Sequence, residues 1–125
     1  MCGIAGVLYF DGTPATEAEI APMLAVQIHR GPDQGAIIVD GGCGLGNRRL
    51  AIQDITPSGA LPMRDGENII AFNGEIYNHP RLRRLLEMEG ARYRSNSDTE
   101  TILKLYRRTS HHLQHPRHRM FAIRL

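Results

Sequence analysis

Residues 1–12 of the chain are MCGIAGVLYFDG. The apolar run from residue 3 to residue 10 predicts a β-strand, because the pair Asp11-Gly12 that follows it is a strong turn signal. The predicted strand begins directly after Cys2. The sequence therefore places a thiol at the start of an early strand.

Further short apolar runs predict strands at residues 36–39, 44–52 and 68–72. Residues 56–63 are rich in proline and glycine, which predicts an irregular loop. Strands and helices come in blocks, and several strands are close enough along the chain to pair antiparallel. This order favours an α+β fold with one folding unit.

Apolar residues at helical spacing predict three helices. The first covers residues 20–28, but its start stays open, because a capping box at Thr16 would leave Pro22 deep inside the helix. The second is expected at residues 78–90, between a capping asparagine and a terminating glycine. Ser97 opens the third with a second capping box.

The composition is that of a folded domain. The chain has 125 residues, of which 42% are hydrophobic and 22% are charged. No apolar run approaches the roughly 18 residues of a membrane-spanning helix, and no secretory signal is present. Two cysteines, Cys2 and Cys43, are too few for a disulfide framework or a multi-cysteine metal site, so we expect a cytoplasmic protein with no membrane partner.

The basic charge of the chain is confined to its last residues. Residues 1–106 contain ten basic and thirteen acidic side chains, whereas residues 107–125 contain five arginines and no acid. A nucleic-acid footprint requires basic charge on a folded face, with aromatic side chains beside it. We therefore expect no nucleic-acid partner.

Cys2 has a chemical role open to it if Met1 is removed. It then carries a free α-amino group beside its thiol, and the amine can take the thiol proton, so that one residue supplies nucleophile and base. A lone cysteine at position 2 is more often incidental. The residues that accompany it decide between these readings.

Several short motifs follow Cys2 in a fixed order. They are MCGIAG at residues 1–6, HRGPD at 29–33, RLAI at 49–52, NGEIYN at 73–78 and SDTE at 97–100. In this order the motifs resemble the N-terminal glutaminase domain of glutamine-hydrolysing asparagine synthetases. Those domains are class II glutamine amidotransferases of the N-terminal-nucleophile (Ntn) hydrolase type.

The resemblance implies a four-layer αββα sandwich with two mostly antiparallel sheets and L-glutamine as substrate. The implied catalytic residues are Cys2, Asn73 and Gly74. The implied glutamine-binding residues are Arg49, Leu50, Ile52, Gln53, Asn73, Gly74, Glu75 and Asp98. Arg49 would hold the substrate carboxylate as a planar two-pronged donor, and Asp98 would hold the ammonium. Without this context, Asn73-Gly74 would predict a plain turn and Asp98 a helix cap.

The resemblance further implies ammonia transfer to aspartate in a separate synthetase domain, which residues 1–125 do not contain. We expect no cofactor and no metal in this domain, with ATP and Mg needed only in the absent one. Two alternatives stay open. The chain is a class II amidotransferase with a different ammonia acceptor, or it is a non-catalytic remnant or binding module.

The resemblance covers residues 1–108 and weakens in the basic tail, residues 109–125. The histidines of this tail are interrupted by Pro116 and accompanied by no carboxylate or thiolate, so we do not expect them to bind a metal. The later strands of the fold are missing from the pattern, which predicts an unpaired sheet edge. From the sequence alone we expect a truncated domain with low or no glutaminase activity in isolation.

Overall fold

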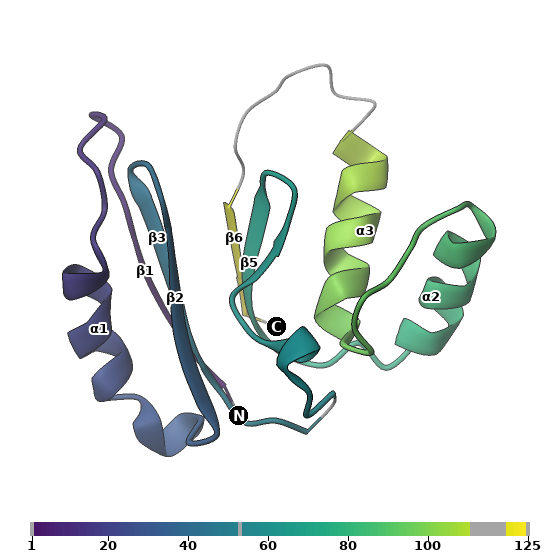
Figure 1. Ribbon diagram of the computed structural model, residues 1–125, viewed down its shortest axis with the longest axis horizontal. Coiled ribbons are helices and arrows are strands. Elements are labelled where there is room, and N and C mark those ends of the chain that lie inside the picture. Colours follow the sequence, from purple (N-terminus) through teal and green to yellow (C-terminus); the bar gives the residue numbers. More distant parts are fainter. Residues whose placement is uncertain (1, 53, 111–119, 125) are drawn as a thin grey trace.

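The computed structural model describes residues 2–52, 54–110 and 120–124 (Figure 1). Along the chain the elements are β1 (Gly3–Leu8), α1 (Glu17–Ala25), β2 (Gln34–Asp40), β3 (Cys43–Arg49), β4 (Met63–Asp65), β5 (Asn68–Asn73), α2 (His79–Met88), α3 (Asp98–Ser110) and β6 (Met120–Arg124). Short 3₁₀ turns lie at Ile28–Arg30 and Pro57–Gly59. Every strand and helix predicted from the sequence is present, but three of them end earlier than predicted: β1 at Leu8 and not at residue 10, α1 at Ala25 and not at residue 28, and β3 at Arg49 and not at residue 52.

The strands form two three-stranded sheets. The first has the order β1-β3-β2 and is antiparallel throughout, with Gly3 and Gln34 opposite Arg48 and Arg49 of β3. The second has the order β4-β5-β6, in which β5 runs antiparallel to β4 and parallel to β6. The α+β prediction with two mostly antiparallel sheets is confirmed. The central strands of the two sheets are β3 and β5.

The two sheets face each other between helices, which gives four layers (Figure 1). Side chains alternate along β5, because successive residues of a strand point to opposite faces. Ile69 and Ala71 pack toward the first sheet, against Leu45 of β3. Ile70 and Phe72 point the other way, into a cluster with Leu103 of α3. This is the layering of the predicted αββα sandwich.

Two glycines of β3 let α1 lie close to the first sheet. A Cβ atom at Gly44 would lie 2.3 Å from Ile20 Cδ1, and one at Gly46 would lie 2.7 Å from Leu24 Cδ1. Ile20 and Leu24 are the buried residues of α1. The small residues of the strand and the large residues of the helix therefore fit together by shape.

The start of α1 shows that Pro22 does not prevent the capping box. The helix begins at Glu17, after the N-cap Thr16, whose backbone N–H donates to the Glu19 carboxylate at 2.8 Å. Pro22 removes only the hydrogen bond that its N–H would have given to the carbonyl of Ala18, a residue on the exposed side of the helix. The helix can therefore include the proline.

The second capping-box prediction is only half right. Ser97 Oγ accepts the N–H of Thr99 at 3.2 Å, as a helix cap does. A capping box also requires the backbone N–H of Ser97 to donate to the Glu100 carboxylate, but this N–H donates to Ser95 Oγ instead. The Glu100 carboxylate accepts the N–H groups of Arg94 and Ser95, at 3.1 and 2.9 Å, because the preceding loop folds back over the helix start.

Helix α2 agrees with its predicted limits but not with every predicted contact. Pro80 lies in its first turn, and Gly90 follows its end with φ of 92°, a backbone conformation that favours glycine. Asn78 is the N-cap residue but makes no capping hydrogen bond with its side chain. Leu86 is buried, whereas Leu85 is 46% exposed.

Strand β6, which was not predicted from the sequence, pairs with one edge of β5 and forms an edge of the second sheet itself. Residues 120–124 pair in parallel with residues 69–73, so β5 has a neighbour on both sides. Residues 111–119, including the histidines of the basic tail, lie outside the described residues. Among the helices that the structure describes, none is long and apolar enough to cross a membrane.

Candidate active site

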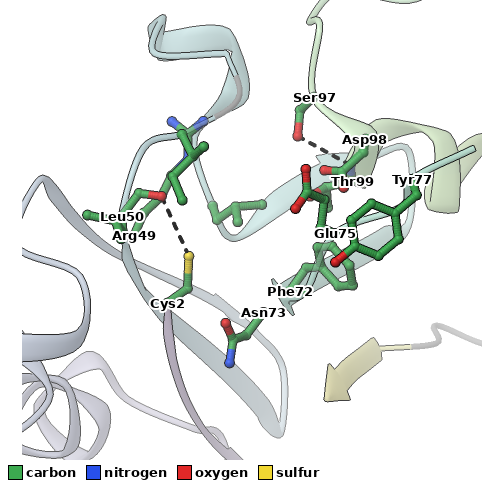
Figure 2. Close-up of a pocket in the computed structure, with 13 residues that line it drawn as sticks. Cys2, Arg49, Leu50, Phe72, Asn73, Glu75, Tyr77, Ser97, Asp98 and Thr99 are labelled. Carbon is green, nitrogen blue, oxygen red and sulfur yellow. Dashed lines mark hydrogen bonds between the residues drawn. The ribbon is translucent and has the colours of Figure 1, made fainter. Parts of the chain in front are cut away.

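A pocket of about 300 Å³ opens where β3 and β5 end (Figure 2). Its walls come from four places in the chain: the start of β1, the segment after β3, the segment after β5, and the start of α3. The lining residues are Cys2, Arg49, Leu50, Ile52, Leu61, Phe72, Asn73, Gly74, Glu75, Tyr77, Ser97, Asp98 and Thr99. The volume is within the ordinary range of small-molecule sites.

Cys2 lies just before β1, with its thiol in the pocket (Figure 2). Its Sγ is 3.9 Å from the carbonyl oxygen of Leu50, which accepts a weak hydrogen bond from the thiol. The Cys2 carbonyl accepts a hydrogen bond from Arg30 Nε at 3.2 Å. The backbone and the side chain of the candidate nucleophile are therefore both held by named partners.

Arg49 is the last residue of β3 and is only 6% exposed. Its Nη2 donates to the backbone carbonyl of Asp54 at 2.5 Å. Gly59 allows this contact, because a Cβ there would lie 2.8 Å from Arg49 Nη2 and 2.7 Å from the Asp54 oxygen. A buried guanidinium with an edge on the pocket is well suited to bind a carboxylate in two-pronged fashion.

Asn73 and Gly74 lie at the end of β5, and their place is fixed from the opposite sheet. Asn47 of β3 is completely buried, and its Oδ1 accepts the backbone N–H of Phe72 at 3.1 Å. Its Nδ2 donates to the carbonyl of Arg48 at 3.1 Å. Asn47 thereby ties the end of β5 to the end of β3, so the residues that follow each strand keep a fixed spacing.

Asp98 is the first residue of α3 and is 6% exposed. Its Oδ2 accepts the backbone N–H of Ile76 at 2.8 Å, which joins the start of α3 to the segment after β5. Glu75 lines the same pocket. Two carboxylates give this wall the negative charge needed to hold an ammonium group, whereas Arg49 gives its own wall a positive charge.

The HRGPD loop supports the pocket from outside. The carbonyl of Gly31 accepts from Arg48 Nε at 2.8 Å, and Asp33 Oδ2 accepts the backbone N–H of Ala51 at 2.8 Å. Together with the contact from Arg30 to Cys2, these bonds connect the loop to the start of β1 and to the end of β3. The motif is thus structural, and its supporting residues are Arg30 and Asp33.

The structure brings together every predicted site residue that it describes. Cys2, Arg49, Leu50, Ile52, Asn73, Gly74, Glu75 and Asp98 all line the pocket. Gln53 lies outside the described residues. No group of three or more potential metal ligands occurs within residues 2–52, 54–110 and 120–124.

Five further lining residues were not predicted from the sequence: Leu61, Phe72, Tyr77, Ser97 and Thr99. Phe72, Tyr77, Ser97 and Thr99 lie within or directly before the NGEIYN and SDTE motifs, so proximity to these motifs was an available signal. Leu61 carried no such signal, because it lies in the predicted irregular loop. Its position depends on how that loop folds back toward β5.

The fold and the pocket define the class of protein. Two sheets face each other between helices, and a cysteine at the start of the first strand points into a pocket at the strand ends, as in Ntn hydrolases. Comparison with protein families agrees, since the glutamine amidotransferase domain matches residues 1–125. The chain belongs to the glutamine amidotransferase domain family.

Relatives of the chain include glutamine-hydrolysing asparagine synthetases from bacteria and plants. Asparagine synthetase 1 of Bacillus subtilis is 40% identical over 111 residues, and these cover 86% of this chain and 18% of the relative. The asparagine synthetase of Asparagus officinalis is 40% identical over 109 residues, or 85% of this chain and 18% of the relative. The chain therefore spans about a fifth of the length of these relatives.

Proposed function

We propose that this chain hydrolyses L-glutamine to glutamate and ammonia, with Cys2 as the nucleophile. One observation carries the proposal: a single pocket contains the thiol of Cys2, the buried guanidinium of Arg49 and the buried carboxylate of Asp98. Glutamine presents three groups that match these in kind, namely an amide carbon, a carboxylate and an ammonium. The names of the asparagine synthetase relatives, which specify glutamine hydrolysis, support the same substrate.

In the proposed complex, Arg49 binds the substrate carboxylate and Asp98 binds the ammonium, with Glu75 beside it. The segment after Arg49, from Leu50 to Ile52, contacts the substrate through its backbone. The binding groups at the α-carbon fix one end of an extended glutamine. Its side-chain amide then points toward Cys2, which is the orientation that a nucleophilic attack requires.

Catalysis proceeds in two halves. With Met1 removed, the α-amino group of Cys2 takes the thiol proton, and the thiolate attacks the amide carbon. The side-chain amide of Asn73 and the backbone N–H of Gly74 donate to the resulting oxyanion. The protonated amine passes its proton to the amide nitrogen, ammonia leaves, and a thioester to Cys2 remains. A water molecule, deprotonated by the same amine, then attacks the thioester and releases glutamate with regeneration of the thiol.

We further propose that the ammonia is used by a synthetase domain that activates aspartate with ATP and Mg. No cofactor enters the chemistry proposed for the glutaminase domain itself.

The proposed nucleophile also bears on where the protein works. A cysteine nucleophile requires a reduced thiol, and Cys2 and Cys43 are both free, which supports a place in the cytoplasm.

The test is the intact mass of the chain after incubation with 6-diazo-5-oxo-L-norleucine, an electrophilic analogue of glutamine. We expect a mass that lacks Met1 and carries one adduct, and no adduct in the Cys2→Ala variant. A folded wild-type chain that stays unmodified would overturn the proposal and favour the non-catalytic alternative. Release of ammonia without asparagine formation in the intact parent protein would favour the other alternative, a different ammonia acceptor.

A further inference from the structure

Asp54 lies in the segment after β3 and makes an unusual number of contacts for one short side chain. Its Oδ2 accepts the backbone N–H of Asn96 at 2.6 Å, across a gap of 42 residues in sequence. Its Oδ1 accepts the backbone N–H of Thr56 at 3.1 Å and the Thr56 hydroxyl at 2.5 Å. Its own backbone carbonyl accepts Nη2 of Arg49. One residue thus contacts Arg49, which lines the pocket, and Asn96, which lies two residues before the pocket residue Asp98.

The backbone of Asp54 is held in a conformation that few residues adopt. Its φ is 48°, and it is the one non-glycine residue with positive φ in the described part of the chain. Aspartate and asparagine tolerate this region better than other side chains do. Such strain persists when surrounding contacts impose it, and it often marks a functional site.

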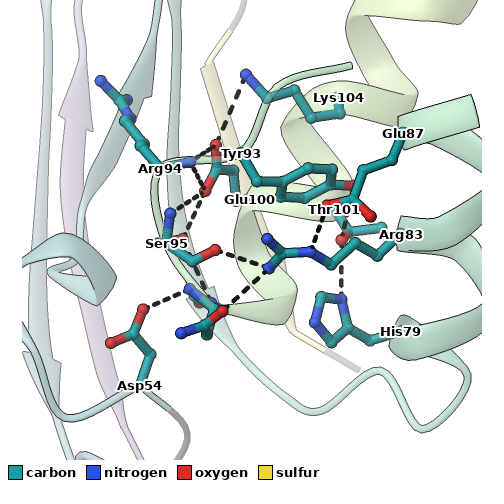
Figure 3. Close-up of polar contacts among 12 residues, drawn as sticks. Asp54, His79, Arg83, Glu87, Tyr93, Arg94, Ser95, Glu100, Thr101 and Lys104 are labelled. Atoms are coloured by element: carbon teal, nitrogen blue, oxygen red, sulfur yellow. Dashed lines mark hydrogen bonds and ion pairs between the residues drawn. The ribbon is translucent and has the colours of Figure 1, made fainter. Parts of the chain in front are cut away.

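The far end of the contact lies in a loop that several side chains hold. Asn96 lies two residues before Asp98, in a loop that Glu100 holds from the inside (Figure 3). Glu100 is 1% exposed, and Lys104 lies 3.6 Å from its carboxylate. Arg83 of α2 holds the same loop as well, because its Nη1 donates to the Ser95 carbonyl at 2.8 Å. Asp54 therefore connects Arg49 to a loop that Glu100 and Arg83 also hold.

We propose that Asp54 is a positioning residue that sets the distance between Arg49 and Asp98, and thereby selects ligands that carry a carboxylate and an ammonium on one carbon. The inference rests on the glutamine site proposed above. Asp54 does not line the pocket, so it acts through the residues that do. Its backbone carbonyl holds the guanidinium, and its carboxylate holds the loop that leads into Asp98.

The test compares two ligands in a background that cannot react. In the Cys2→Ala chain, the affinity for L-glutamine and for 4-carbamoylbutanoate, which lacks the amine, is measured by titration calorimetry. Asp54→Asn then keeps the shape and the tolerance of positive φ but cannot accept at both oxygens. Asp11→Asn is the matched control, because Asp11 also accepts a hydrogen bond from the backbone two residues later, at Thr13, and does not line the pocket.

We expect Asp54→Asn to weaken glutamine binding about tenfold and to weaken 4-carbamoylbutanoate binding less than threefold, because only glutamine uses both ends of the spacing. Asp11→Asn should change neither affinity. Equal weakening of both ligands would indicate general damage and would overturn the inference, as would unchanged glutamine binding. Asp54→Gly, which suits the backbone and also lacks the carboxylate, must reproduce the ligand dependence.

This design separates the inference from the proposed function. Failure of the norleucine analogue to label a chain whose Cys2→Ala form binds glutamine would overturn catalysis and leave the role of Asp54 standing. Labelling of the wild type together with an Asp54→Asn variant that binds both ligands normally would do the reverse. A Cys2→Ala chain that binds no glutamine at all would overturn both.

Discussion

Arg30 donates a hydrogen bond from Nε to the backbone carbonyl of Cys2 at 3.2 Å. The two residues come from different parts of the chain, Arg30 from the HRGPD loop and Cys2 from the start of β1. The bond restrains the backbone of the candidate nucleophile without touching the space that a substrate would occupy, because Arg30 does not line the pocket. Small displacements of a nucleophile have large effects on rate.

Replacement of Arg30 should therefore slow catalysis without abolishing substrate binding. We expect Arg30→Met to reduce the rate of Cys2 labelling by roughly tenfold to a hundredfold at saturating analogue. The concentration for half-maximal labelling should change less than threefold. Arg84→Met, on the exposed side of α2, is the control and should label at the wild-type rate. A change confined to the half-maximal concentration would contradict the role assigned to Arg30.

Asn73 should contribute to the transition state and little to substrate binding. We expect Asn73→Ala to lower glutamine turnover by about 10²–10³-fold with little change in KM, because an oxyanion donor acts after the attack has begun. Turnover is measured as ammonia release. Asn78→Ala changes the same residue type in the same motif, outside the pocket, and should retain activity. A variant at Asn73 with normal turnover would remove it from the proposed mechanism.

Asn47 should matter for stability because it is completely buried between the sheets. Asn47→Ala leaves the N–H of Phe72 without its acceptor, and we expect a loss of about 1–3 kcal/mol in the free energy of unfolding, measured with urea. Asn68→Ala, at the other end of β5, serves as the matched substitution and should cost less. A loss at Asn47 no larger than at Asn68 would show that the bridge between the sheets is unimportant.

The fit of α1 on β3 predicts a specific coupling between two core positions. Gly44→Ala should destabilise the fold by about 1–3 kcal/mol, because the new methyl group would overlap Ile20 Cδ1. Ile20→Val removes that atom and alone should cost about 0.5–1.5 kcal/mol. The loss of unfolding free energy in the double variant should be smaller than the sum of the two single losses, by at least about 0.5 kcal/mol. Additive losses in urea titrations would contradict direct contact.

The hydrogen bond from the Tyr9 hydroxyl to the Glu19 carboxylate predicts a pH window for stability. Tyr9, followed by Thr16, lowers the pKa of Glu19 below its ordinary value of 4.5, and this contribution disappears as pH falls through the folded-state pKa. Glu19 raises the pKa of Tyr9 above its ordinary value of 10.0, and this contribution is full below the ordinary value and disappears as pH rises through the raised folded-state pKa. When midpoints of urea unfolding are measured from pH 3 to pH 11, the alkaline loss should be absent in Tyr9→Phe. The acid loss should be smaller but still present, because Thr16 also donates to the Glu19 carboxylate. Parallel pH profiles for the two chains would contradict the prediction.

The sequence predicted the layers of the fold because their signals are local. The runs GIAGVL in β1 and NIIAFN in β5 are apolar and bounded by turn residues, and the apolar spacing around Leu103 is helical. Strand β6 had no such support, since its five residues follow a basic stretch and their pairing partner lies in β5. Local periodicity does not predict which distant segments pair with each other.

The candidate site was predicted from motifs, and this explains which residues were missed. The RLAI, NGEIYN and SDTE motifs contain Arg49, Asn73 and Asp98, which supply the charges and the hydrogen-bond donors that glutamine needs. They did not name Asn47 or Asp54, whose roles depend on contacts with Phe72 and Asn96 in other elements. A supporting residue is recognised by its partners, and the partners become visible only when the chain is folded.

Both sheets present their central strand to the pocket, β3 through Arg49 and β5 through Asn73. A central strand loses its hydrogen bonds only when a large part of the domain opens, whereas edge segments exchange their amide protons through small local openings. The floor of the pocket therefore belongs to the part of the molecule that we expect to exchange most slowly. Arg49 and Asn73 should then keep their positions while segments at the edges of the two sheets open and close.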